Sequence, residues 1–227
     1  MQNETCNLSN CFLCRLCVPE WKEAIKNHKQ TITVEKGREI FREGDEVKGI
    51  FFISEGSVKV YKKWTEDKEL IVRFARTGDI LGHRGIGGSD RYPIGASALE
   101  STKVCFISND FFEASLKINH LLTYQLMHFY AMELQQAEKR MRDLAHSEVK
   151  GRIAQALLEI SDLFGLNKDR YFAVPINRQD IASYAGTTYK TIFKFFKELT
   201  RNGIISTSGK NIRINQAGKL KRFIAGN

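Results

Sequence analysis

The hydrophobic period of the sequence changes near residue 120, and this change most constrains the fold. From about Thr31 to Ser108, apolar and polar residues alternate in short runs that are separated by turns containing Gly. From Leu121 to Leu144 there is neither Gly nor Pro. Short strands with frequent turns are typical of a β-sandwich or a barrel-like roll. The uninterrupted stretch predicts a long helix, so we expect an α+β chain.

The long helix carries an apolar residue at every third or fourth position. These residues are Met127, Tyr130, Leu134, Ala137, Met141 and Leu144, and polar side chains fill the other faces. Packing on the core of its own domain could produce such a pattern. A seam this narrow and this long more often meets a partner helix. The sequence therefore predicts that these six residues form a homodimer interface.

Near the C-terminus, two further helices are predicted with a tight turn between them. Asn177 can cap the first helix, and Asp180 is placed to reach back as in a capping box. Gly186 permits a left-handed turn out of that helix. Thr187 or Thr188 can cap the second helix. This arrangement is the helix-turn-helix pattern, preceded by a helix over residues 147–164.

The second helix of this pair is amphipathic. Its apolar residues are Ile192, Phe195, Phe196 and Leu199, and its outward face carries Tyr189, Lys190, Thr191 and Lys194. Two apolar strands then flank a Ser-Gly-Lys-Asn turn that contains Lys210. This second pattern predicts a β-hairpin wing.

Most of the positive charge is concentrated in the same region. Residues 171–227 hold ten Lys and Arg against two acids, a net charge of +8 out of +9 for the whole chain. A basic surface that is merely solvated would have the same composition. Together with the helix-turn-helix pattern, however, it predicts that this part binds double-stranded DNA.

Five cysteines point to a second chemistry. They are Cys6, Cys11, Cys14, Cys17 and Cys105. The N-terminus has no basic region followed by an apolar run, so we expect a cytoplasmic protein in which disulfides are rare. The cluster then indicates metal, an iron–sulfur cluster or redox-active thiols.

Other functional classes find little support in the sequence. No stretch approaches the roughly 20 apolar residues of a membrane helix. The five histidines are scattered, and no catalytic Ser/His/Asp order, phosphate loop or carboxylate pair stands out. We therefore expect neither a membrane protein nor an enzyme.

Several stretches, taken in order, resemble the CRP/FNR family of bacterial transcription regulators. They are Lys36-Gly37 through Phe41, Gly44-Asp45, Ile53 to Gly56, Gly78 to Gly82, Ala98-Leu99-Glu100, and Asn177 to Lys194. It is their ordered combination over nearly the whole chain that is specific. The resemblance implies an N-terminal β-roll of the cyclic-nucleotide-binding-domain type, a long dimerisation helix and a C-terminal winged helix-turn-helix. The corresponding parts are residues 1–20 (a Cys-rich segment), 21–118, 119–146 and 147–227.

The resemblance also implies roles at the DNA. A homodimer would read a two-fold symmetric site, with RNA polymerase as a further partner of an activator. By family position, Arg178, Thr188 and Thr191 contact phosphates, while Tyr189, Lys190 and Lys194 face the base edges. The sequence departs from the family at two of these positions, since Lys190 and Lys194 stand where Glu and Arg are common. Lysine only donates and favours guanine, so the family's usual half-site cannot be assumed.

The cyclic-nucleotide branch of the family has a Glu after the glycine at position 82 and an Arg-Ser pair further on. Here His83 follows that glycine, and Pro93-Ile94 stands near the second place. A cyclic phosphate would lack its anchor, which disfavours cyclic AMP. Arg84 and Arg91 are nearby, so a different anionic effector bound beside His83 remains an alternative.

The oxygen-sensing branch carries three N-terminal cysteines and one in the β-roll, which together hold an iron–sulfur cluster. By resemblance, Cys11, Cys14, Cys17 and Cys105 would be the four ligands of a [4Fe–4S] cluster, with Cys6 as an alternate. The spacing departs from the family, since the second gap is shorter here. Structural zinc and unliganded reactive thiols are the other two interpretations of the cysteines.

The alternative to a DNA-binding regulator is a β-roll module that regulates a partner protein without binding DNA.

Overall fold

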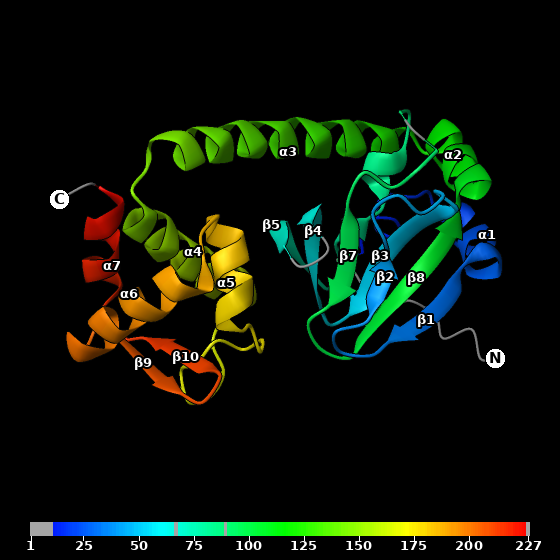
Figure 1. Ribbon diagram of the computed structural model, residues 1–227. Coiled ribbons are helices and arrows are strands. Elements are labelled where there is room, and N and C mark those ends of the chain that lie inside the picture. Colours follow the sequence, from blue (N-terminus) through cyan, green and yellow to red (C-terminus); the bar gives the residue numbers. More distant parts are fainter. Residues whose placement is uncertain (1–10, 66–67, 89, 226–227) are drawn as a thin grey trace. The chain divides into compact units, whose positions relative to one another are not determined.

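The computed structural model describes residues 11–65, 68–88 and 90–225, which divide into two compact units (Figure 1). The first unit lies within Met1–Lys63 and Arg73–Leu134, and the second within Trp64–Val72 and Gln135–Asn227. The long helix α3 (His120–His146) contributes to both. The four-part division drawn from the sequence separates expected functions rather than compact units, and it stays a prediction.

Two four-stranded sheets form the predicted β-roll. The first has the strand order β1-β8-β3-β6, and the second has the order β2-β7-β4-β5. The strands of the first sheet are β1 (Gln30–Val34), β8 (Thr102–Ser108), β3 (Gly49–Glu55) and β6 (Ile80–Leu81). Those of the second are β2 (Glu39–Phe41), β7 (Gly95–Ala98), β4 (Ser57–Thr65) and β5 (Lys68–Arg76). The expected β-roll is confirmed.

The centre of the first sheet is buried on both faces. Strand β3 has a continuous apolar run in which Ile50 through Ile53 are all buried. A run of this kind is typical of a strand that is covered on both sides, unlike the half-buried alternation of an exposed sheet. Strand β8 lies between β1 and β3, so that Cys105 pairs with Thr31 on one side and with Phe52 on the other. Cys105 is therefore an interior residue of the sheet.

Two short helices of the β-roll region were not expected from the sequence. They are α1 (Trp21–His28) and α2 (Asn109–Ile118). The indole of Trp21 stacks on Phe111 with ring centroids 5.6 Å apart, and its Nε1 donates to Ser115 Oγ at 2.9 Å. Trp21, Ala24 and Ile25 of α1 follow helical spacing and pack on the core, but eight residues span too few turns for this pattern to be distinctive in the sequence.

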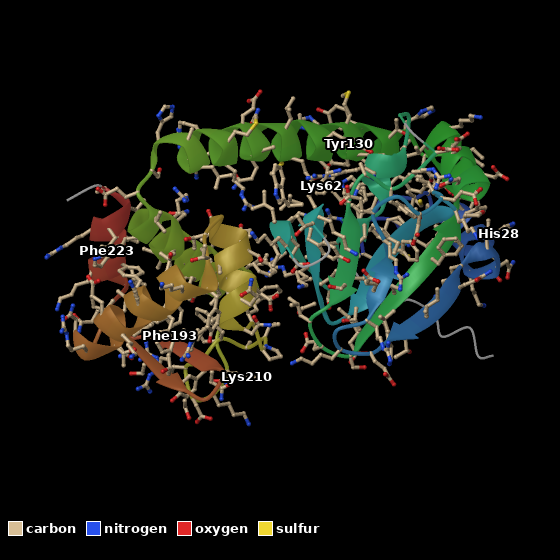
Figure 2. The ribbon with its side chains drawn as sticks, in the orientation of Figure 1. His28, Lys62, Tyr130, Phe193, Lys210 and Phe223 are labelled. Atoms are coloured by element: carbon tan, nitrogen blue, oxygen red, sulfur yellow. The ribbon has the colours of Figure 1, made fainter. Side chains whose placement is uncertain are left out.

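The second unit contains the predicted helix-turn-helix and wing. After α3 come α4 (Val149–Phe164), α5 (Arg178–Ala185), α6 (Tyr189–Arg201), the strands β9 (Ile205–Ser208) and β10 (Asn211–Ile214), and α7 (Ala217–Ile224). The terminal helix α7 was not expected. Gly151 lets α7 lie close to α4, since a Cβ at this position would be 2.7 Å from the carbonyl oxygen of Phe223 (labelled in Figure 2).

The wing is a tight antiparallel hairpin. Ser208 pairs with Asn211, which leaves Gly209 and Lys210 as a two-residue turn. Gly209 has a φ of 58°, a conformation that favours glycine at the first position of such a turn. The backbone N–H of Phe172 donates to the carbonyl of Ile212 at 2.9 Å and ties the hairpin to the loop before α5.

Candidate functional site

Local signals fix the start of α5 and the turn that follows it. The side chain of Asn177 accepts from the backbone N–H of Asp180 at 2.8 Å, and Asp180 accepts from the backbone N–H of Asn177 at 3.4 Å. The predicted capping box is therefore present. Gly186 ends the helix with a φ of 62°. These two features set the geometry from which α6 starts.

Helix α6 presents one face to the protein core and another to solvent. Of the two threonines considered, Thr188 is the cap, and its Oγ1 accepts from the backbone N–H of Thr191 at 3.2 Å. The inward row consists of Ile192, Phe195, Phe196 and Leu199, and all four are buried. Tyr189, Lys190 and Lys194 are exposed, as expected, while Thr191 is half-buried.

The remaining predicted DNA contacts lie on other elements of the same unit. Arg178, the first residue of α5, is half-buried, with its guanidinium 5.6 Å from the centre of the Phe196 ring. Lys210 is exposed at the tip of the hairpin β9–β10 (Figure 2). Glu198, one of the two acids of this region, is paired with Lys150 at 2.7 Å. The exposed end of α6 and the hairpin tip are thus left with a positive charge.

The sequence interpretation missed Phe193, whose side chain is 40% exposed on α6 (Figure 2). It lies between the buried Ile192 and the exposed Lys194. The sequence could have indicated its exposure, because Phe193 lies four residues after the outward Tyr189 and therefore shares its face of the helix.

The described cysteines lie in or against one apolar cluster of the first unit, with Cys11, Cys17 and Cys105 buried and Cys14 partly buried. Cys11, Cys14 and Cys17 occupy the segment before α1, and they share one apolar cluster with Cys105 of β8. The segment is held by the backbone N–H of Phe12, which donates to the carbonyl of Gly78 at 3.0 Å. Cys6 lies outside the described residues.

The four described cysteines of this cluster are free of disulfide bonds. Burial, together with the neighbouring Cys11, raises the pKa of the Cys17 thiol to about 11. Within the described chain, no three His, Cys, Asp or Glu side chains are grouped closely enough to hold a metal ion. A metal would therefore have to draw the thiols together as it displaced their protons.

A third polar site joins the β-roll turn η1 (His83–Gly85) to α3. Glu133 of α3 is only 12% exposed, and its Oε2 lies 3.0 Å from His83 Nε2 and 3.0 Å from Arg84 Nη2. Its Oε1 lies 3.4 Å from Arg73 Nε. The hydroxyl of Tyr130, one turn earlier on α3, donates to the carbonyl of His83. The sequence interpretation missed Glu133 and Arg73, because nothing near them in the chain indicates this contact.

These contacts and the burial of the site shift the pKa values of Glu133 and His83. Burial alone would raise the pKa of Glu133, but the hydrogen bond to His83 and the charges of Arg73 and Arg84 lower it to about 2. Burial lowers the pKa of His83, and the hydrogen bond to Glu133 opposes this only in part. His83 Nδ1 has no hydrogen-bond partner in the described part of the chain.

The predicted effector residues do not come together as a set. His83 and Arg84 both contact Glu133, whereas the guanidinium of Arg91 donates to the carbonyl of Gly44 at 2.8 Å. The first two are thus used to hold α3, and the third belongs to a different turn.

The predicted seam of α3 is partly free and partly used within the chain. Met127, Leu134, Ala137 and Met141 are exposed. Tyr130 and Leu144 are half-buried, because Tyr130 contacts the η1 turn and Leu144 lies against Gly186. The assignment of these two residues to the dimer interface stays a prediction. The exposed apolar side chains also include Leu121, Tyr124 and Met132, which the heptad pattern omitted.

Two family models match the chain in the order of its units. A cyclic nucleotide-binding domain matches residues 31–119, and a Crp-like helix-turn-helix domain matches residues 151–223. The chain is 28% identical to the fumarate and nitrate reduction regulatory protein of Vibrio cholerae over 93% of its own length and 87% of that protein. It is 27% identical to the transcriptional activator protein anr of Pseudomonas aeruginosa, over 96% of its own length and 92% of that protein.

The chain belongs to the CRP/FNR family.

Solved structures of this family agree with the fold. FixK2 from Bradyrhizobium japonicum superposes with a TM-score of 0.75 and 25% identity, over 86% of this chain and 96% of that one. A CooA mutant from Carboxydothermus hydrogenoformans has a TM-score of 0.74 at 19% identity, over 97% and 99% of the two chains, a likeness of fold alone. As a member of the CRP/FNR family, the protein is a transcription regulator with a helix-turn-helix DNA-binding domain.

Among the residues that the structure describes, none of the helices combines the length and the apolar character that crossing a membrane requires.

Substitution Glu133→Gln tests the polar site of this CRP/FNR protein. It leaves the half-buried Arg73 without the counter-charge of Glu133, so we expect the free energy of unfolding to fall by about 2–4 kcal/mol. Because Glu133 has a lowered pKa in the fold, its stabilisation is present above its ordinary value of 4.5 and is lost as the pH falls towards about 2. The difference between the two proteins in urea unfolding should therefore shrink with acid below about pH 4.5.

The matched control is Glu138→Gln, an exposed glutamate on the same helix. It should change the free energy of unfolding by less than about 0.5 kcal/mol. An equal loss in both variants, or a difference that does not depend on pH, would contradict the assigned role of Glu133.

Proposed function

We propose that the protein is a homodimeric, sequence-specific DNA-binding regulator whose N-terminal thiols sense the signal. The observation that carries the DNA part is the exposed N-terminal end of α6. Thr188 caps this end, the buried row beneath it fixes its rotation, and Tyr189, Lys190 and Lys194 are left facing solvent. The recognition helix of a helix-turn-helix reads the major groove with its N-terminal residues.

The roles of the individual residues follow from chemistry and position. Arg178, Thr188 and Thr191 are proposed to bind phosphates and so fix the register on the duplex, and Lys210 at the wing tip adds a further phosphate contact. Lys190 and Lys194 are proposed to donate to guanine O6 and N7. The four-part division into residues 1–20, 21–118, 119–146 and 147–227 describes this function: thiol segment, sensor roll, dimerisation helix and DNA-binding part.

A salt titration of duplex binding tests the DNA interface. Each lysine or arginine that neutralises a phosphate releases counterions, so the affinity should fall steeply as salt rises. Lys210→Gln, at a proposed phosphate contact, should reduce the slope of log affinity against log salt by about 1, whereas Lys190→Gln and Lys194→Gln should each weaken binding to the preferred site by about 1–3 kcal/mol. Fluorescence anisotropy with a labelled duplex measures both the slope and the affinity.

Lys117→Gln on α2 removes the same charge from an exposed position of the sensor roll and should leave the slope unchanged. A wild-type protein that binds no duplex, or binds with a flat salt dependence, would favour a β-roll module that regulates a protein partner instead.

The exposed apolar face of α3 is proposed to join two copies of the chain. Met127, Leu134 and Met141 are each at least 60% exposed and recur at heptad spacing. A row of this length in water favours burial against an identical row. Two joined copies would place two recognition helices on a two-fold symmetric site.

Sedimentation of Leu134→Glu tests the homodimer. The wild type should sediment as a dimer at micromolar concentration. The variant removes two buried leucines and adds two like charges, so its dissociation constant should rise by about two to three orders of magnitude. The neighbouring Gln135→Glu adds the same charge beside the row and should remain dimeric. A monomeric wild type would overturn the dimer.

The sensor is proposed to be a [4Fe–4S] cluster on Cys11, Cys14, Cys17 and Cys105, with Cys6 as an alternate ligand. The donor set would be four thiols, of which Cys11, Cys17 and Cys105 are buried in one apolar cluster and Cys14 is partly buried against it. When bound, the cluster would supply a redox-active centre that reacts with oxygen or a related oxidant. The protein's part is to shield it with apolar side chains and to keep Cys105 fixed in the sheet.

Anaerobic purification followed by an absorption spectrum and metal analysis tests the cluster. About four iron and four sulfide per chain are expected. Cys105→Ser should remove most of the iron, whereas Cys6→Ser should leave it in place if Cys6 is only an alternate. Zinc in place of iron, or no metal under anaerobic conditions, would overturn the iron–sulfur proposal and support the structural-zinc or free-thiol interpretation.

Further parts of the proposal follow from the target. A DNA-binding regulator works in the cytoplasm, where bacterial DNA is, and an activator would also contact RNA polymerase.

The relatives named above are regulators rather than enzymes, and we propose no catalysis for this chain. Cyclic AMP is not proposed as the effector, because Arg84 is held by Glu133 and Arg91 by a backbone carbonyl. A different small effector in the β-roll would have to compete with these contacts.

A further inference from the structure

Two aromatic side chains form a pair on the exposed face of α6. Tyr189 is 48% exposed and Phe193 is 40% exposed. Their ring centroids are 6.4 Å apart, with 24° between the ring planes. Single exposed apolar residues are ordinary on protein surfaces. A stacked pair in the first two turns of a recognition helix, by contrast, lies where base edges are read.

Lys197 extends this pair into a row along the helix. Its Nζ lies 4.7 Å from the centre of the Phe193 ring, within the range of a cation–π contact. Tyr189, Phe193 and Lys197 are spaced four residues apart and therefore share one face. We call Tyr189 and Phe193 the aromatic strip. Contacts at both ends hold the Phe193 ring in place while its outer side remains exposed.

A second row runs beside the aromatic strip. Lys190 and Lys194 follow Tyr189 and Phe193 by one residue each, and both are exposed. The reading face of α6 therefore has a donating side and an apolar side. The lysines can donate to acceptors of a base, but the ring of Phe193 can neither donate nor accept a conventional hydrogen bond.

We propose that the aromatic strip contacts thymine methyl groups, which makes Phe193 a specificity-determining residue. This inference rests on the DNA-binding function proposed above. In the major groove, only thymine presents an apolar group, its C5 methyl. Any other base edge under the ring would lose water from a donor or acceptor without gaining a partner. Each half-site should therefore carry a thymine beside the guanine contacted by the lysines.

Replacing thymine by deoxyuridine tests the contact, because it removes the methyl group and leaves base pairing unchanged. The anaerobically purified full-length protein first selects its preferred duplexes from a random library. Thymines of the selected site are then replaced one position at a time, in both half-sites together. Burial of one methyl-sized group is worth about a 4-fold change in affinity. Because the replacement removes one methyl group from each of the two half-sites, we expect a loss of about 15-fold at the contacted position.

Phe193→Ala assigns the methyl to this side chain. The variant should bind the selected duplex more weakly and should respond to the deoxyuridine by less than about 2-fold. Phe193→Leu keeps an apolar side chain and should keep part of the response. Thr200→Ala, at the other end of the same helix, should respond as the wild type does. The salt slope should stay the same in all four proteins, because none of these substitutions removes a charge.

The outcomes separate this inference from the function on which it rests. If the wild type binds its selected duplex in a salt-dependent way but tolerates deoxyuridine at every position, the methyl contact is wrong and the DNA-binding function stands. If Phe193→Ala keeps the full response, another side chain contacts the methyl, and the role of Phe193 is wrong. If no duplex is selected or bound, the DNA-binding function itself fails, and the inference fails with it.

Discussion

The buried carboxylate of Glu133 holds the η1 turn of the β-roll against α3. It contacts His83, Arg84 and Arg73, which come from two separate stretches of the sensor. A carboxylate at this depth is stable only if these basic groups remain in place, because an uncompensated buried charge is costly. The first half of α3 is therefore fixed to its own β-roll by a directional contact, and its apolar face is free to meet another chain.

The cysteine segment reaches the same helix by a different route. Phe12, next to Cys11, packs edge-on against Phe129 of α3 with ring centroids 5.6 Å apart. Phe129 in turn lies 5.1 Å from the ring of His83. The thiols and the buried carboxylate thus adjoin one stretch of α3 through close-packed rings. Because a close-packed interior is barely compressible and transmits strain, a displacement of the thiol segment and a displacement of the η1 turn would reach the same turn of α3.

What could be predicted from the sequence was governed by distance along the chain. The helix-turn-helix followed from signals within a few residues of one another, namely Asn177 with Asp180, and Gly186 before Thr188. The heptad pattern located the apolar row of α3, but it could not show that Tyr130 turns towards the β-roll. The contact of Glu133 could not be predicted for the same reason, since its partner His83 lies 50 residues away in the chain. The proposed thiol ligands came from residue type and family position, and their gathering at one apolar cluster depends on the strand pairing of Cys105.

The recognition helix combines two physical effects that depend differently on salt. Its buried row fixes the rotation of α6, so that Lys190 and Lys194 stand beside the ring of Phe193. The attraction of lysines to the duplex weakens as salt rises, because counterions released into a more concentrated salt solution gain less entropy. Contact between a ring and a methyl group is not screened by ions. Affinity for any duplex should therefore decline with salt faster than the preference for a thymine-bearing site, because the part of the discrimination that Phe193 contributes comes from an uncharged side chain.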